Sequence, residues 1–196
     1  VKFKDKITCY KKENGFLGIL SLINGELFFA SKSTNKGVFA DYFKKIFDES
    51  CIDKIKLINY LKNHDVSLAF EVIDIENDPH IIKYDKSKIV LLDIIYNDYE
   101  FKKEPYEKVV ELAKLLCCEC KTIYKEFDDV REFHKWYLDN TDEEDLSKED
   151  IEGVVIESSG IMTKLKFPYY LFQSYIYHTF RKNNHPLPYL LYLELL

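Results

Sequence analysis

The chain has 196 residues, of which 46% are hydrophobic and 32% charged, and its formal net charge is −6. This length suits one sizeable domain, or one domain with a small appendage, and the composition is that of a globular protein rather than a disordered one. The negative charge argues against tight, non-specific binding to nucleic acid, although it is compatible with an enzyme whose cationic residues gather in one cleft.

The first third of the chain predicts β-structure followed by helices. Asn24-Gly25 is a strong signal for a two-residue hairpin between two strands. The strands are predicted at Ile7–Lys12, Phe16–Ile23 and Glu26–Ser31, and the helices at Val38–Asp48 and Cys51–Asn63.

The rest of the chain alternates between the two kinds of element. Strands are predicted at Val66–Asp74, Lys88–Tyr96, Thr122–Glu126, Gly153–Glu157 and Met162–Phe167. Helices are predicted at Pro105–Glu119, Asp128–Leu138 and Pro168–Arg181, with an acidic linker at Thr141–Asp150 and an apolar tail after Pro186 that we expect to pack. The pattern indicates an α+β fold, with mainly antiparallel sheets and flanking helices.

The cysteines and the apolar runs indicate the compartment. Five cysteines, odd in number and unevenly placed, predict free thiols in a reducing cytoplasm. Cys117, Cys118 and Cys120 lack the spacing of a zinc site, and the first two lie inside a predicted helix. No apolar run approaches the ~20 residues of a membrane span and no signal peptide is visible, so we expect a cytoplasmic protein with no membrane partner.

A short polar segment, Lys12-Glu13-Asn14-Gly15, lies between two predicted strands and carries a candidate nucleophile. By itself it reads as an ordinary polar turn. A lysine that attacks phosphorus must be a neutral amine, and further cations and a divalent metal must offset the charge that builds up on the phosphoryl group. Such a metal prefers carboxylate oxygens as ligands. The chemistry therefore requires more lysines and glutamates at strand ends.

Further lysines and glutamates do occupy positions in or beside predicted strands. Glu71 has apolar neighbours on both sides, and Glu152 directly precedes Gly153-Val154-Val155-Ile156. Lys164 and Lys166 alternate and therefore point to one face of a strand. Lys32 follows the third predicted strand. Any one of these positions could be an ordinary charged site on a half-exposed sheet, but the ordered set argues for function.

The set resembles the covalent nucleotidyltransferases, which comprise RNA ligases, DNA ligases and mRNA capping enzymes. Five elements match that family in order: Lys12–Gly15, Ser31-Lys32, Phe70-Glu71, Glu152–Val155 and Lys164–Lys166. The resemblance runs from Ile7 to about Tyr170 and implies a nucleotidyltransferase (ATP-grasp-like ligase) core. Lys32 and Tyr170 are similar to the phage RNA ligase 1 and tRNA ligase branch, and so is Asn14, which replaces the commoner Asp.

The resemblance implies an ATP-dependent RNA ligase that uses Mg²⁺ or Mn²⁺. Lys12 would attack ATP, and AMP would pass to an RNA 5′-phosphate that a 3′-hydroxyl then attacks, as in RNA repair or tRNA processing. The implied nucleotide contacts are Glu13 to adenine, Glu71 to ribose, Lys32, Lys164 and Lys166 to phosphate, and Asn14, Gly15, Gly153 and Tyr170 beside them. Glu152 would hold the metal or the lysine, and Glu71 is a second candidate metal ligand. Tyr170 could instead belong to an aromatic core, and His80 is a lesser candidate for touching substrate.

The sequence departs from that branch before the nucleophile. Relatives carry more chain there, including an arginine that helps to bind the nucleotide, whereas eleven residues precede Lys12. We therefore expect one adenylyltransferase domain over 1–196 that lacks upstream and C-terminal segments, with weak adenylation and with sealing that needs missing segments or a partner chain. The alternatives are an mRNA-capping guanylyltransferase and a non-catalytic nucleotide- or RNA-binding module with a decayed ligase fold.

Overall fold

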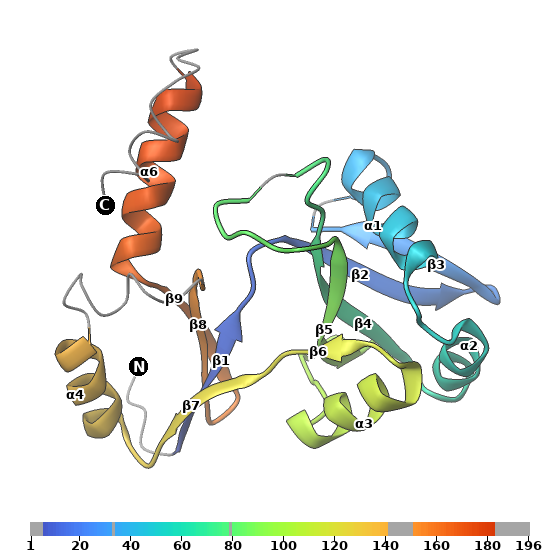
Figure 1. Ribbon diagram of the computed structural model, residues 1–196. Coiled ribbons are helices and arrows are strands. Elements are labelled where there is room, and N and C mark those ends of the chain that lie inside the picture. The colour runs from blue at the N-terminus through green and yellow to red at the C-terminus, as the bar shows by residue number, and fades with distance from the viewer. Residues whose placement is uncertain (1–5, 33, 79, 141–150, 183–196) are drawn as a thin grey trace. The chain divides into compact units, whose positions relative to one another are not determined.

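A computed structural model describes residues 6–32, 34–78, 80–140 and 151–182 of the chain (Figure 1). The predicted linker at 141–150 and the predicted packing of the tail after Pro186 lie outside these residues. The chain divides into two compact units. The first unit comprises the described residues of Val1–Glu13, Ile81–Lys83 and Thr122–Leu196, and the second comprises those of Asn14–His80 and Tyr84–Lys121.

The second unit is a five-stranded sheet with helices packed on it. Its strands are β2 (Phe16–Ile23), β3 (Glu26–Ser31), β4 (Val66–Ile73), β5 (Lys88–Tyr96) and β6 (Glu119–Cys120), in the order β3-β2-β4-β5-β6. Its helices are α1 (Val38–Glu49), α2 (Lys54–Asn63) and α3 (Tyr106–Leu116). All strand pairs are antiparallel except β5 with β6.

Alternating apolar residues of this sheet form the core of the second unit. Leu68, Phe70 and Val72 of β4 are fully buried and belong to one cluster with Phe43 and Phe47 of α1. Since alternate residues of a strand point to opposite faces, Ser67, Ala69 and Glu71 belong to the other face. Glu71 therefore lies on the face of the sheet that does not join this core.

The turn and the helix ends of the second unit follow from local chemistry. The predicted hairpin is confirmed, because Asn24 and Gly25 join β2 to β3 with φ values of 52° and 86°. Helix α2 begins after Asp53, whose side chain accepts a hydrogen bond from the Lys56 backbone at 3.0 Å. The predicted end of α3 at Glu119 is wrong, because Cys117 adopts a left-handed conformation that stops the helix at Leu116.

The first unit is a four-stranded antiparallel sheet in the order β7-β1-β8-β9. Its strands are β1 (Ile7–Lys12), β7 (Ile123–Phe127), β8 (Gly153–Ser158) and β9 (Ile161–Lys166), and its helices are α4 (Val130–Asn140) and α6 (Pro168–Lys182). Ile7, Val154 and Phe167 form its core, with Phe133 and Trp136 of α4 packed against them. The predicted α+β class with mainly antiparallel sheets is therefore confirmed.

A buried ion cluster joins β5 to later segments of the second unit. Asp93 of β5 accepts hydrogen bonds from the ammonium groups of Lys121 at 2.7 Å and Lys103 at 3.1 Å, and all three side chains are nearly buried. The backbone N–H of Lys121 also donates to Leu91. These contacts fix the chain where it leaves the second unit.

Among the helices that the structure describes, none is long and apolar enough to cross a membrane.

Candidate active site

The Lys12 side chain forms an ion pair with the buried carboxylate of Glu152, inside the first unit. Its Nζ lies 2.8 Å from Glu152 Oε2, and the Nζ of Lys166 lies 2.7 Å from the other oxygen, Oε1. The Glu152 side chain is only 3% exposed, against 18% for Lys12 and 35% for Lys166. One carboxylate thus holds two ammonium groups, and the cluster carries an excess positive charge.

Strand register brings these three residues together. Lys12 is the last residue of β1 and pairs with Gly153 of β8, which pairs on its other side with Lys166 at the end of β9. Directly paired residues project to the same face, so the two lysines flank a glycine that has no side chain. Glu152 directly precedes Gly153, and its backbone carbonyl accepts a hydrogen bond from Phe167 at 3.1 Å.

The ion pairs shift two pKa values in opposite directions. Burial by itself would raise the pKa of the Glu152 carboxyl, but hydrogen bonds from Lys12 and Lys166 hold it below its ordinary value of 4.5. Burial by itself would lower the pKa of Lys166, but the hydrogen bond and charge of Glu152 raise it above its ordinary value of 10.5. Glu152 is therefore an anion, and Lys166 a cation, at neutral pH.

The other predicted residues of the first unit lie at different depths. Tyr170 is buried, with its ring centroid 4.9 Å from the Lys166 ammonium, so it packs beside the cluster. The Glu13 side chain pairs with Lys11 at 3.3 Å, and its backbone carbonyl accepts a hydrogen bond from Lys12 at 3.3 Å. Lys164, opposite Val155, is exposed.

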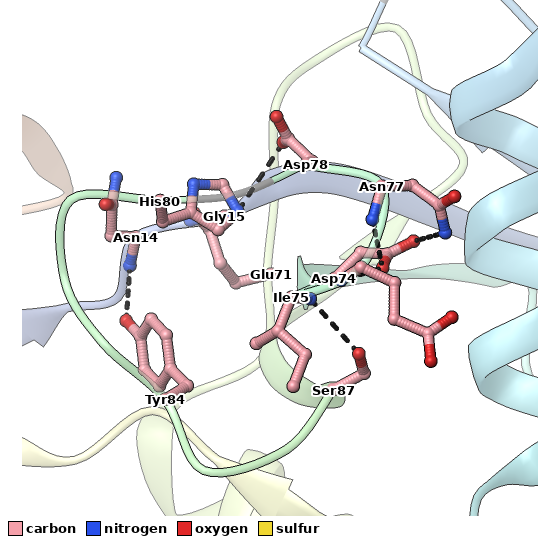
Figure 2. A network of polar contacts seen from close by, with 11 residues as sticks. Asn14, Gly15, Glu71, Asp74, Ile75, Asn77, Asp78, His80, Tyr84 and Ser87 are labelled. Carbon is pink, nitrogen blue, oxygen red and sulfur yellow. Dashed lines mark hydrogen bonds and ion pairs between the residues drawn. The ribbon is translucent and has the colours of Figure 1, made fainter. Parts of the chain in front are cut away.

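Asn14 and Gly15 are held in the second unit by two side-chain oxygens (Figure 2). The backbone N–H of Gly15 donates to Glu71 Oε1 at 2.8 Å. The backbone N–H of Asn14, a residue only 8% exposed, donates to the Tyr84 hydroxyl at 2.8 Å. The sequence motifs do not mark Tyr84, because it lies in a connecting segment 70 positions from Asn14 and no spacing rule links the two.

Gly15 and Gly153 both lie where a side chain has no room. A Cβ at Gly15 would stand 2.3 Å from the Val72 carbonyl oxygen, and one at Gly153 would stand 2.1 Å from that of Leu165. Each of these two glycines lies close to the backbone of a neighbouring strand within its own unit. Lys32 follows β3 and is exposed.

The two predicted carboxylate ligands, each taken within its own unit, do not form a ready cage for a metal. Each Glu152 oxygen faces an ammonium group, and Glu71 Oε1 faces a backbone N–H. The described part of the chain holds no group of three or more His, Cys, Asp or Glu side chains that could bind a metal ion. Mg²⁺ is commonly held by one or two carboxylates together with substrate phosphates, and single carboxylates such as these suit that arrangement.

A family model described as RNA ligase matches residues 2–170 of the chain. The chain belongs to the RNA ligase family. The resemblance seen in the sequence motifs is thus confirmed at the level of the family. A search of curated protein sequences gave no match.

Solved ligase structures share the fold of this RNA ligase family member. An archaeal ATP-dependent RNA ligase is 13% identical with a TM-score of 0.70, and the match covers 97% of this chain and 50% of that one. Naegleria gruberi RNA ligase with PPi is 16% identical with a TM-score of 0.66, and a variant of it with ATP and Mn is 14% identical with a TM-score of 0.66. Each of these two matches covers 88% of this chain and 52% of the Naegleria chain. These identities establish a shared fold, and the chain spans about half the length of the solved proteins it matches.

Proposed function

We propose that this chain is the adenylyltransferase part of an ATP-dependent RNA ligase, with Lys12 as the nucleophile that becomes bonded to AMP. The observation that carries the proposal is the pairing of Lys12 with Glu152, 2.8 Å apart, and the second ammonium group of Lys166 on the same carboxylate. A lysine held at one place beside another cation is what an attack on a nucleotide phosphate requires.

In the first step, Lys12 reacts as a neutral amine after releasing a proton to solvent. Its Nζ forms a bond to the α-phosphorus of ATP, and the bond from that phosphorus to the bridging oxygen breaks, so pyrophosphate leaves. Lys166 stays protonated beside Glu152, because its pKa is raised, and offsets negative charge on the phosphoryl oxygens. Glu152 keeps both lysine side chains in place.

Roles for the remaining predicted residues follow the family resemblance. Glu71 would contact the ribose, Glu13 the adenine, and Lys32 and Lys164 the phosphates. A divalent metal would neutralise phosphate charge when bound, with Glu152 or Glu71 as a protein ligand. The solved variant of the Naegleria enzyme with ATP and Mn supports the use of ATP and of a divalent ion.

The later steps would join RNA ends. An oxygen of an RNA 5′-phosphate attacks the phosphorus of the lysyl-AMP, the bond to Lys12 Nζ breaks, and AMP caps the RNA. A 3′-hydroxyl then attacks the RNA phosphate and AMP leaves. Membership of the RNA ligase family supports this substrate class.

The mass of the intact protein after incubation with ATP and Mg²⁺ or Mn²⁺ tests the proposal. Wild type should gain one AMP, and Lys12→Arg should gain none, because arginine keeps the charge beside Glu152 but stays protonated and is a poor nucleophile. Lys11→Arg is the matched control on the same strand and should behave as wild type. RNA with a 5′-phosphate should take AMP from the wild-type adduct, whereas RNA with a 5′-hydroxyl should not.

Other results would favour the other functions. Mass gain from GTP instead of ATP would indicate a capping guanylyltransferase. Binding of ATP without a covalent adduct would indicate a binding module. An adduct that forms equally well on Lys12→Arg would show that another residue is the nucleophile.

A further inference from the structure

The segment that follows the nucleophile is held by two side chains, only one of which the sequence motifs mark. Consecutive backbone N–H groups, those of Asn14 and Gly15, donate to Tyr84 and Glu71, both at 2.8 Å. Gly15 packs so tightly on β4 that no Cβ fits there. The backbone two and three residues after Lys12 therefore has little freedom while both acceptors are present.

Tyr84 belongs to the connection between β4 and β5, whose two ends are ordered by hydrogen bonds (Figure 2). The buried Asp74 carboxylate accepts from the backbone of Glu76 and Asn77, each at 3.0 Å, and from the Asn77 side-chain amide at 2.8 Å. Ser87 Oγ accepts from the Ile75 backbone at 3.1 Å and ties the two ends of the segment together. Aspartate acceptors of this kind are a usual way to fix a turn.

A cation beside the ring supports the orientation of Tyr84. The Lys88 ammonium lies 5.8 Å from the Tyr84 ring centroid, and Lys88 is itself held by Glu119 at 2.7 Å. The ring that carries the hydroxyl is thus oriented toward Asn14 by Lys88, and the connection that carries the ring is fixed at both ends by hydrogen bonds. A buried N–H that lost this acceptor would be left without the hydrogen bond it makes here.

We propose that Tyr84 is a positioning residue for the reaction of Lys12, acting through its hydrogen bond to the Asn14 backbone rather than by touching ATP. This inference rests on the proposed function. Small displacements of a reacting group can cost about 100-fold in rate, and a bond that limits the freedom of the adjoining backbone should affect the rate of attack more than the affinity for nucleotide.

The test is Tyr84→Phe, which removes the hydroxyl and keeps the ring. The rate of AMP attachment to the full chain should be measured over a range of ATP concentrations, together with backbone amide hydrogen exchange at Asn14. We expect a saturating rate about 10-fold lower, a half-saturating ATP concentration within about twofold of wild type, and faster exchange at Asn14. The matched control is Tyr42→Phe, because Tyr42 is a half-buried tyrosine of α1. This substitution should change neither the saturating rate, nor the half-saturating ATP concentration, nor the exchange at Asn14.

Each other outcome overturns the inference in a recognisable way. An unchanged saturating rate, or unchanged exchange at Asn14, would show that the hydroxyl does not position this segment. A higher half-saturating ATP concentration at an unchanged maximal rate would mean that Tyr84 contacts the nucleotide. Absence of an adduct in wild type would overturn the proposed function as well, whereas the first two results would leave it intact.

Discussion

Glu152 shows how one buried carboxylate can organise two lysines. A carboxylate with 3% exposure is costly to bury unless it is paired, and here each oxygen faces an ammonium group at 2.7–2.8 Å. The lysines in turn are kept close together by an anion that lies between them. Removal of Glu152 would thus leave two neighbouring like charges with no shared partner.

The free energy of unfolding should depend on pH because of the pairing of Glu152 with Lys12 and Lys166. Glu152 has a lowered pKa, so its contribution to the free energy of unfolding is present above pH 4.5 and is lost as pH falls through its folded pKa. Lys166 has a raised pKa, so its contribution is present below pH 10.5 and is lost as pH rises through its folded pKa. Glu152→Gln should cost on the order of 1–3 kcal/mol at neutral pH, less than a fully buried pair because Lys166 is partly exposed.

Urea unfolding of wild type and Glu152→Gln at several pH values checks this prediction. The difference between the two should be level from pH ~6 to ~9 and should shrink toward both extremes. Glu126→Gln is the control, since Glu126 makes an exposed ion pair with Lys6 and should matter by less than ~1 kcal/mol. A Glu152→Gln difference that did not vary with pH would contradict the ionic role of Glu152.

At the scale of elements, the end of β8 needs a residue without a side chain. Gly153 has φ 150°, a region that L-residues rarely adopt, and its Cα faces the Leu165 carbonyl of β9. The register that places Lys12 and Lys166 on either side of Gly153 depends on this close contact. The glycine thus connects a backbone requirement to the geometry of the lysine cluster.

Gly153→Ala should therefore destabilise the first unit and impair AMP attachment. The added Cβ would lie 2.1 Å from a backbone oxygen, so the strands must separate locally, at a cost of more than ~2 kcal/mol. Gly160→Ala offers a control in the β8–β9 turn, where φ is 75° but the space is open, with an expected cost of about 1 kcal/mol. Urea unfolding and adduct mass would measure both variants, and equal effects would show that the close contact at Gly153 has no special importance.

Strands and helices were predictable where local patterns are strong. The Asn24-Gly25 hairpin follows from turn chemistry, and β5 follows from its apolar run. The end of α3 was not predictable, because helical periodicity continues into Cys117 and Cys118 while the backbone turns left-handed at Cys117. Strand β6, which follows α3, has only two residues, so it is too short for an alternating pattern that would predict a strand.

At the scale of the whole molecule, the fold class was accessible from the sequence but the long-range pairings were not. Alternating strand and helix patterns indicate α+β structure, and the ordered motifs gave the family. The placement of β1 between β7 and β8 joins segments more than a hundred residues apart. The contact of Tyr84 with Asn14 is of the same kind, since neither residue belongs to a motif that predicts the other.

The two units differ in how much apolar surface their described residues bury. The buried cluster in the second unit includes residues from three strands, β2, β4 and β5, and from three helices, α1, α2 and α3. The cluster in the first unit is smaller, and its buried members are Ile7, Cys9, Phe127, Val154, Ile156 and Phe167. Since apolar burial contributes about 25 cal/mol per Å² to folding, we expect the first unit to open at a lower free energy than the second.

Native-state hydrogen exchange can measure this difference strand by strand. Amides of β4, the central strand of the five-stranded sheet, should exchange most slowly, and those of β1 and β8 should exchange through a lower-energy opening. Leu68→Ala, in the second core, should lower protection in β4 by about 2–4 kcal/mol, because it leaves a cavity among fully buried neighbours. Slower exchange in β1 than in β4 would contradict the expected order of opening. The same result would place Lys12 in the more stable unit, so any loss of adduct in Gly153→Ala would then reflect a local change at the strand end rather than opening of the unit.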